Sequence, residues 1–204
     1  TLMEFYNQGC EILSYVQQHR QKLFPSKDVV LLGIEHPIEE QIRPGVTFIG
    51  YIDILVKNEK TGKITIYDLK TSRASWTQAQ KSDPVKLNQI LLYKKFISEK
   101  FDVPLEMVGT EFVILKRTIS ENSPYPIPRV SSFEPSNGKP SVNRAWGHIE
   151  AFLNECFDSD GNYRTDLIKA NPGKDSCKYC IFNDKEVYCQ ESFYKIKKAK
   201  VVNG

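Results

Sequence analysis

Hydrophobic positions recur with two different periods in the first third of the chain. Residues 1–23 place their apolar side chains three and four positions apart, which predicts an amphipathic helix. Short apolar runs at 29–35 and 38–42 are typical of strands, and a Pro-Gly turn follows them. Two further runs, 47–57 and 63–70, are rich in Val, Ile, Thr and Tyr and flank a short polar turn, which predicts a β-hairpin.

The helical period returns after the hairpin. Asp83 and Pro84 suit the N-cap and the first position of a long helix. An apolar run at 107–117 predicts another strand, and residues 120–140 contain five prolines and predict an extended, exposed segment. Residues 141–157 predict a further helix. The predicted order up to 117 is therefore α-β-β-β-α-β, within a single domain formed by the 204 residues.

The predicted hairpin brings two carboxylates together. Folding the chain about the centre of Glu59–Gly62 sets Asp53 close to opposite Asp68, a pairing that a bulge at Gly62 would shift by one residue, and Lys70 shares the Asp68 face of the sheet. Two like charges that face each other among apolar neighbours destabilise a strand pair unless a positive group lies between them. A divalent cation with oxygen ligands would remove that conflict, and the lysine would add a second positive group. The alternative is a hairpin whose polar face is simply solvated.

Further signals flank the hairpin. A carboxylate ends the first predicted strand, and a Gln and a Tyr lie four residues apart on one face of the helix that follows the hairpin. Four motifs thus come in chain order: Glu35, Gly50-x-x-Asp53, Asp68-x-Lys70 and Gln89-x-x-x-Tyr93. Their order and spacing resemble the PD-(D/E)XK nuclease superfamily, and in particular its RecB-type exonuclease branch. The resemblance implies a restriction-endonuclease-like α/β fold with an αβββαβ core, in which helices flank a central mixed sheet.

The same resemblance assigns the chemistry to six side chains, those of Glu35, Asp53, Asp68, Lys70, Gln89 and Tyr93. Asp53 and Asp68 would bind one or two Mg²⁺ or Mn²⁺ ions, with the main-chain carbonyl of Leu69 as a neutral ligand. Glu35 would bind metal or orient the attacking water. Lys70 would polarise that water or stabilise the transition state. The Gln and Tyr of the helix would position the scissile phosphate.

Charge is distributed unevenly along the chain, although the formal net charge is only +3. Residues 1–56 carry four basic and seven acidic side chains, whereas residues 57–100 carry ten basic and four acidic ones. The basic part surrounds the Asp-x-Lys motif, a layout that suits DNA as the partner, either single strands or duplex ends. Lys-rich solvated surface is the alternative for the charge pattern taken alone.

Two residues beyond the Asp-x-Lys motif are candidates for nucleic-acid contact. Arg73 and Trp76 lie among small hydroxyl residues, where they could contact a phosphate and stack on a base. A core position is the alternative for Trp76.

Composition places the protein among soluble globular ones, with 40% hydrophobic and 26% charged residues. No run approaches the ~18–20 apolar residues that span a bilayer, and no signal-peptide pattern opens the chain. We therefore expect an intracellular, cytoplasmic protein, and its compact size suits a phage or mobile-element source. The chain begins at Thr1 rather than at Met, which indicates a fragment or a processed product.

Three cysteines lie in a C-terminal segment, about residues 171–204. Cys177 and Cys180 are spaced by two residues and Cys189 follows, which suits a metal or cluster site. The RecB-type branch often carries an iron–sulfur cluster on three C-terminal cysteines and one N-terminal cysteine. That resemblance implies a 4Fe-4S cluster or zinc, with Cys10 as the fourth ligand here and Cys156 as another candidate. Structural thiols in a reducing compartment are the alternative.

The leading hypothesis is a divalent-metal-dependent DNA exonuclease of recombination, repair or phage DNA metabolism. A helicase or a recombinase is a candidate partner for such an enzyme. A non-catalytic DNA-binding or assembly module that keeps the nuclease fold is the alternative from another class, and an RNA-directed nuclease is a third. DNA binding without cleavage in Mg²⁺ or Mn²⁺ would distinguish the binding module.

Overall fold

The structure is a computed structural model that describes residues 1–23, 27–119, 124–125, 127–164, 172–182 and 189. The chain forms two compact units. The first comprises Thr1–Phe152 and Ser159–Gly161 and contains the whole five-stranded sheet. The second comprises Leu153–Asp158 and Asn162–Gly204, and its described part includes the short helix α6, Lys174–Lys178. The cysteine-containing segment at 171–204 falls within this second unit.

The N-terminal helical pattern forms two helices, α1 (Leu2–Gln18) and α2 (Arg20–Leu23). The side chain of Thr1 accepts a hydrogen bond from the backbone of Glu4, whose own side chain accepts from the Thr1 amino group, so α1 begins with a capping box. Only Ile12 of α1 is fully buried among the described residues of this helix. The predicted helix is confirmed, but it is divided at His19.

The five strands form one mixed sheet in the order β1-β2-β3-β4-β5. Their bounds are β1 Val29–Arg43, β2 Val46–Asn58, β3 Ile64–Ser72, β4 Val108–Lys116 and β5 Val130–Phe133. The pair β3 and β4 is parallel and the other three pairs are antiparallel. A mixed sheet with helices beside it confirms the predicted α/β class, and the order α1-β1-β2-β3-α4-β4 confirms the predicted core order.

Two strand predictions need correction. The runs at 29–35 and 38–42 are one continuous strand, β1, which passes through Pro37. Proline is tolerated there because β1 is an edge strand of the sheet. The proline-rich segment is also not wholly exposed, because Val130–Phe133 pairs with β4 and Val130 is buried, and its last two residues already belong to helix α5 (Lys139–Cys156).

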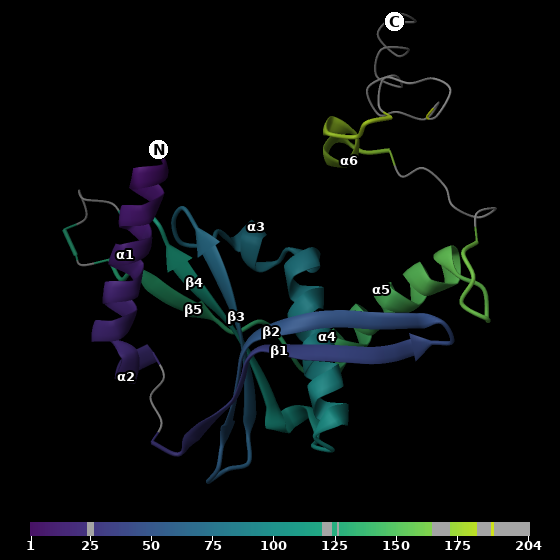
Figure 1. The fold of residues 1–204 in the computed structure, drawn as a ribbon, viewed down its shortest axis with the longest axis horizontal. Coiled ribbons are helices and arrows are strands. Elements are labelled where there is room, and N and C mark those ends of the chain that lie inside the picture. The colour runs from purple at the N-terminus through teal and green to yellow at the C-terminus, as the bar shows by residue number, and fades with distance from the viewer. Residues whose placement is uncertain (24–26, 120–123, 126, 165–171, 183–188, 190–204) are drawn as a thin grey trace, which may run out of the picture. The chain divides into compact units, whose positions relative to one another are not determined.

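The sheet splits between β2 and β3. These strands pair only along Ile54–Lys57 and Ile64–Tyr67. Beyond that point β2 pairs with β1 alone, and β3 pairs with β4 alone. Figure 1 shows the two-stranded ribbon of β1 and β2 turning away from β3 and running across helix α4. We call the point of separation the strand fork.

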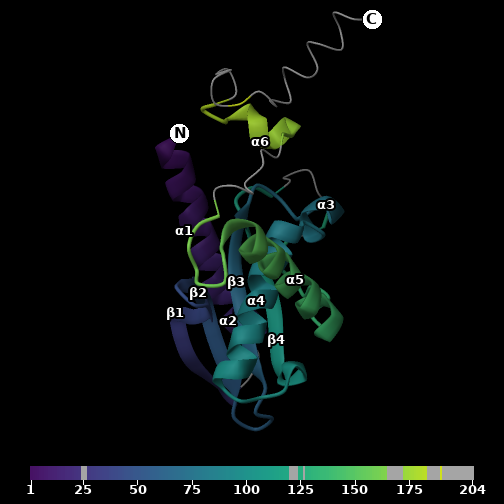
Figure 2. The same ribbon diagram turned by 90° about the vertical axis from the view of Figure 1, so that its right-hand side faces the viewer.

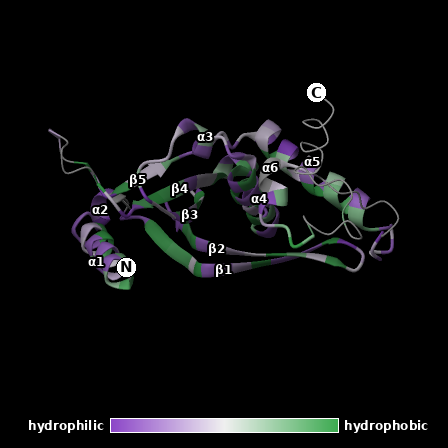
Figure 3. Cartoon of the chain, turned by 90° about the horizontal axis from the view of Figure 1, so that it is seen from above, coloured by the Kyte–Doolittle hydropathy of each residue, from purple (hydrophilic) through white to green (hydrophobic). Residues whose placement is uncertain are grey.

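Helix α4 lies at the centre of the packing. The helices after the hairpin are α3 Gln78–Lys81, α4 Pro84–Lys100, the 3₁₀ turn η1 Leu105–Met107 and α5 Lys139–Cys156. Asp83 caps α4 and Pro84 is its first residue, as the sequence predicts. Buried residues occur on every side of α4, because β-strands, the ribbon and α5 surround it (Figure 2). Hydrophobic residues also dominate much of the strands (Figure 3). Among the described helices none is long and apolar enough to cross a membrane.

Candidate active site

The strand fork brings the two predicted aspartates together. Ile54 pairs with Tyr67, so the next residues across the fork are Asp53 on β2 and Asp68 on β3. The side chain of Asp53 reaches over to β3, where its Oδ2 accepts a hydrogen bond from the Leu69 amide at 2.5 Å. The register of the hairpin therefore brings the two aspartates close together as predicted, without a one-residue shift, although the strands are no longer paired at this point.

Asp68 carries a charge in an unfavourable place. Its side chain is only 5% exposed, and its Oδ2 lies 2.8 Å from Lys70 Nζ. Burial raises the pKa of the Asp68 carboxyl, the neighbouring Lys70 ammonium opposes that shift, and the charge of Asp53 adds to it. The carboxyl therefore lies between an ammonium that favours its charge and a like charge that opposes it.

A chain of polar contacts joins this pair to α4. Lys70 Nζ donates to Gln89 Oε1 at 3.3 Å, and Gln89 Nε2 donates to the Tyr93 hydroxyl at 3.1 Å. Gln89 and Tyr93 lie four residues apart, so one face of α4 presents both side chains to the fork. Gln89 is held at both ends of its amide, which fixes the orientation of that amide.

A glycine on the ribbon makes room for Tyr93. A Cβ added at Gly50 would lie 2.7 Å from Tyr93 Cε1 and 3.0 Å from its hydroxyl oxygen. Phe48, two residues before Gly50 on β2, also contacts this ring: the rings of Phe48 and Tyr93 meet edge-on, with their centroids 6.4 Å apart. The motif glycine is thus explained by close packing of β2 on α4. The sequence motif contained this residue, but periodicity alone did not show what it contacts.

Glu35 lies near the fork but is not gathered into the aspartate pair. Its neighbours Ile34 and His36 pair with Ile54 and Ile52, which places Glu35 level with Asp53. Its backbone is left-handed, with φ 48°, an uncommon conformation for a residue with a side chain. Within the described residues, no group of three His, Cys, Asp or Glu side chains is arranged to hold a metal ion. The metal-binding role of Glu35 stays a prediction.

The aspartate pair nevertheless fits a hard divalent cation. Asp68 Oδ2 is buried, and the contact recorded for it within the described residues is the Lys70 ammonium at 2.8 Å. The Asp53 carboxylate is beside it, and both offer oxygen ligands of the kind that Mg²⁺ prefers. The residues that would hold such an ion are Asp53 and Asp68, together with the main-chain carbonyl of Leu69, which directly follows Asp68.

The two residues predicted to touch nucleic acid differ in exposure. Arg73 is exposed just beyond β3, where its carbonyl accepts hydrogen bonds from Thr118. Trp76 is only 7% exposed, and its ring lies 5.2 Å from that of Phe112 and 6.4 Å from that of Phe133. Trp76 is therefore a core residue, and the prediction that it stacks on a base is wrong for this structure, because its ring faces are covered.

The cysteines predicted to hold a cluster differ in exposure. Cys177 is buried, Cys180 is exposed and Cys189 is half-buried. Because the described residues include all three and contain no metal-holding group of three side chains, the structure does not support an iron–sulfur or zinc site on them. Cys10 is exposed on α1, and Cys156 is half-buried at the end of α5.

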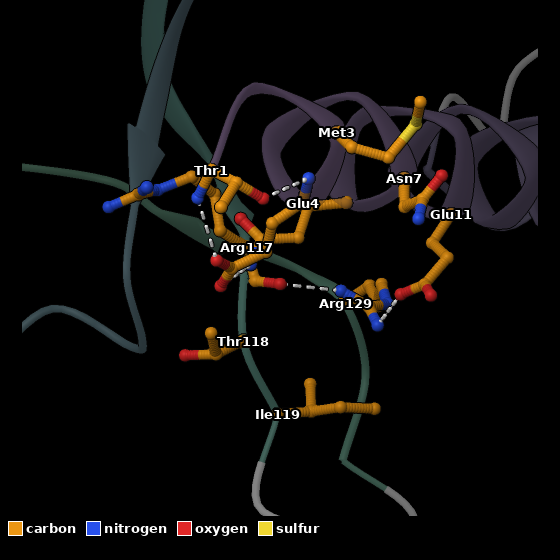
Figure 4. Close-up of a pocket in the computed structure, with 10 residues that line it drawn as sticks. Thr1, Met3, Glu4, Asn7, Glu11, Arg117, Thr118, Ile119 and Arg129 are labelled. Atoms are coloured by element: carbon orange, nitrogen blue, oxygen red, sulfur yellow. Dashed lines mark hydrogen bonds and ion pairs between the residues drawn. The ribbon is translucent and has the colours of Figure 1, made fainter.

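A separate cavity of about 470 Å³ lies between α1 and the residues around the end of β4 and the start of β5 (Figure 4). Arg117 and Arg129 both line it, and Arg129 pairs with Glu11 and donates to the carbonyl of Arg117 at 2.8 Å. Its charge is thus already compensated, and the cavity does not contain the Asp-x-Lys residues. Sequence patterns had singled out none of these residues.

Comparisons with known proteins identify the family of this chain. The family model of the PD-(D/E)XK nuclease superfamily matches residues 10–185. Among solved structures, the crystal structure of SSO0001 is similar with a TM-score of 0.41 and 15% sequence identity, covering 87% of this chain and 67% of that chain. A search of curated proteins finds no match. Since the family model spans most of its length, the chain belongs to the PD-(D/E)XK nuclease superfamily.

Proposed function

We propose that this protein is a divalent-metal-dependent deoxyribonuclease that hydrolyses phosphodiester bonds at the strand fork. The observation that carries the proposal is the continuous contact from Asp53 through Leu69 and Asp68 to Lys70 and Gln89. An ion pair alone is a common surface feature, but here the acid is buried and a second acid faces it. Superfamily membership supports nuclease activity for such an arrangement.

The two aspartates and the Leu69 carbonyl would hold Mg²⁺ or Mn²⁺. When bound, the ion would lower the pKa of the attacking water and neutralise charge that develops on the phosphate. Asp53 is already oriented for this role, because the Leu69 amide holds one of its oxygens at 2.5 Å. Glu35, level with Asp53 on β1, would complete the acid set by orienting the water.

We propose that Lys70 contacts the substrate phosphate and is not retained only to stabilise the fold. Its side chain is 28% exposed, so the ammonium could meet a substrate oxygen without leaving Asp68. A positive group at that point stabilises negative charge as it develops in the transition state. Gln89 holds the ammonium from the side of α4, and Tyr93 holds Gln89. The hydroxyl of Tyr93 accepts from Gln89, which leaves its own proton available for donation.

The substrate we propose is DNA, attacked from an end as in the RecB-type exonuclease branch. Support comes from the order of the four motifs and from the basic side chains between residues 57 and 100. Roles in recombination, repair or phage DNA metabolism, and a helicase or recombinase partner, belong to the same proposal.

The test is hydrolysis of 5′- and 3′-labelled single- and double-stranded DNA, and of RNA of the same sequence, in Mg²⁺, Mn²⁺ or EDTA. We expect a ladder or mononucleotides from DNA with metal and no product in EDTA. Asp53→Asn and Lys70→Ala should each lower the rate by roughly 100-fold or more. Lys22→Ala, at an exposed lysine of α2 outside this basic stretch, is the control and should keep the parent rate.

The outcomes separate the competing functions. Equal rates for the parent, Asp53→Asn and Lys70→Ala would refute the assignment of the site. Salt-sensitive DNA binding with no cleavage in either metal would favour a binding module that keeps the nuclease fold. Preference for the RNA strand would replace DNA as the substrate.

A further inference from the structure

A second cavity lies on the flank of α4 that faces α5. It has a volume of about 290 Å³ and is bounded by the start of α4, the first half of α5, and β5 with the loop that follows it. Figure 2 shows α4 and α5 side by side on this part of the first unit. We call it the α4–α5 pocket. Leu87, Leu91 and Phe133 supply its apolar lining.

The polar lining of the α4–α5 pocket is cationic. Lys81 and Arg144 contribute two positive charges, and none of the residues that line the pocket is Asp or Glu. Within the described residues neither cation forms an ion pair, and Arg144 is exposed. This is unlike the cavity of Figure 4, whose Arg129 is paired with Glu11. An uncompensated pair of cations in a concave site favours an anionic ligand.

A histidine adds a directed donor beside these cations. Asn88 Nδ2 lies 2.9 Å from His148 Nδ1, and an amide nitrogen can only donate. Nδ1 is therefore the acceptor, and the imidazole proton sits on Nε2, free to donate to a ligand. His148 and Arg144 lie four residues apart on α5, so both side chains reach the same part of the pocket.

The apolar side of the pocket includes an aromatic ring. One side of Phe133 stacks on Phe112, with ring centroids 6.3 Å apart and planes 8° from parallel. Lys81 Nζ lies 5.3 Å from the Phe133 centroid. A flexible lysine over an aromatic ring can move aside for a planar group while keeping its charge near that group.

We propose that the α4–α5 pocket binds a nucleotide, with the phosphate at Arg144 and His148 and the base against Phe133 and the leucines. The proposal rests on the nuclease function, because α4 carries Gln89 on the active-site flank and Asn88 on the pocket flank. The ligand is either a free mononucleotide or one nucleotide of a bound DNA strand. Both have the same combination of an acceptor-rich phosphate and a flat ring.

The experiment measures binding by calorimetry and by NMR shifts of the intact protein in EDTA, so that hydrolysis does not occur. The probes are dAMP, inorganic phosphate, deoxyadenosine and a 5′-phosphorylated oligothymidylate. Arg144→Gln should weaken binding of the phosphate-bearing nucleotide probes by roughly tenfold to a hundredfold, because a charge-assisted hydrogen bond is lost. Arg20→Gln, an equally exposed arginine on α2, is the matched control and should bind like the parent.

Each outcome decides the proposal. Binding of dAMP that Arg144→Gln weakens, and that Asp53→Asn leaves unchanged, supports the pocket independently of catalysis. Tight binding of the oligonucleotide but weak binding of dAMP assigns the ligand to a DNA strand, and the reverse assigns it to a free mononucleotide. Equal affinity of Arg144→Gln and the parent for every probe, or no nucleotide binding by the parent at millimolar concentration, overturns it. Loss of hydrolysis by Asp53→Asn tests the nuclease function separately.

Discussion

Replacing Asp68 with Asn should stabilise the metal-free protein while abolishing its activity. The Asp68 carboxyl is buried and faces Asp53, and these effects outweigh the favourable Lys70 contact, because the pKa of Asp68 is raised overall. Asparagine keeps the shape and an acceptor for Lys70 but carries no charge. The substitution therefore removes the unfavourable free energy of burying a charged carboxylate next to Asp53, which the folded protein tolerates because the active site needs that charge.

The magnitude follows from linkage. Each unit by which a folded-state pKa is raised corresponds to about 1.4 kcal/mol of disfavour for the charged form. Lys70 loses an ionic partner, but its side chain is 28% exposed and still donates to Gln89, so its ammonium is not left buried and unpaired. We expect Asp68→Asn to gain on the order of 1 kcal/mol at pH 7, which is about 2–4 °C in melting temperature for a chain of this size.

The assay is thermal and urea unfolding in EDTA between pH 7 and pH 3.5. A raised acid pKa means that the cost is fully present above the folded-state pKa and disappears as pH falls toward the ordinary value of 3.8. The gain of Asp68→Asn should therefore shrink with falling pH. Added Mn²⁺ should stabilise the parent and not the variant. A variant less stable than the parent by more than about 1 kcal/mol at pH 7 would show that the Lys70 contact dominates, contrary to this reasoning.

Two further predictions concern α4. Gly50→Ala should lower the hydrolysis rate by about tenfold or more without unfolding the protein, because its Cβ would lie 2.7 Å from the Tyr93 ring and displace that ring. The control Gly147→Ala meets no atom within 4 Å and should leave the rate unchanged. Steady-state kinetics with circular dichroism would check both variants, and unchanged kinetics for Gly50→Ala would contradict the packing argument. Burial lowers the pKa of Lys94, whose Nζ donates to Asn137 at 2.7 Å, so the cost of its charge is present at pH 7 and is relieved as pH rises toward 10.5. Lys94→Met should thus be equally or more stable at pH 7 by up to about 2 kcal/mol and lose that advantage at pH 10, and urea unfolding that shows the opposite trend would refute the assignment.

The local part of the candidate site could be predicted from the sequence because the hairpin fixes it. A four-residue turn and alternating strands determine which residues face each other, and Asp53 and Asp68 follow by counting. The face shared by Gln89 and Tyr93 follows in the same way from the helical period. Periods of two and 3.6 residues are short-range properties, so they survive without knowledge of the tertiary structure.

What the sequence did not predict depends on contacts between distant segments. Trp76 has the same local surroundings whether it stacks on a base or packs in the core, and only Phe112 and Phe133, far along the chain, decide between them. The spacing of Cys177 and Cys180 likewise does not determine where their thiols point. The α4–α5 pocket combines α4 with α5, and its one local signal is the four-residue spacing of Arg144 and His148.

The strand fork allows Asp53 and Asp68 to lie close together, which a continuous β2–β3 ladder would not. In a continuous β2–β3 pair the two carboxylates would face each other along a fully bonded ladder, and their repulsion would have no outlet. Because β2 pairs with β3 only from Ile54 onward, the Leu69 amide is released from cross-strand pairing and donates to Asp53 instead. The separation thus supplies a hydrogen bond for one acid, while Lys70 compensates the other. A substitution that extended the β2–β3 ladder by one pair should therefore remove the Leu69 contact and force the carboxylates apart.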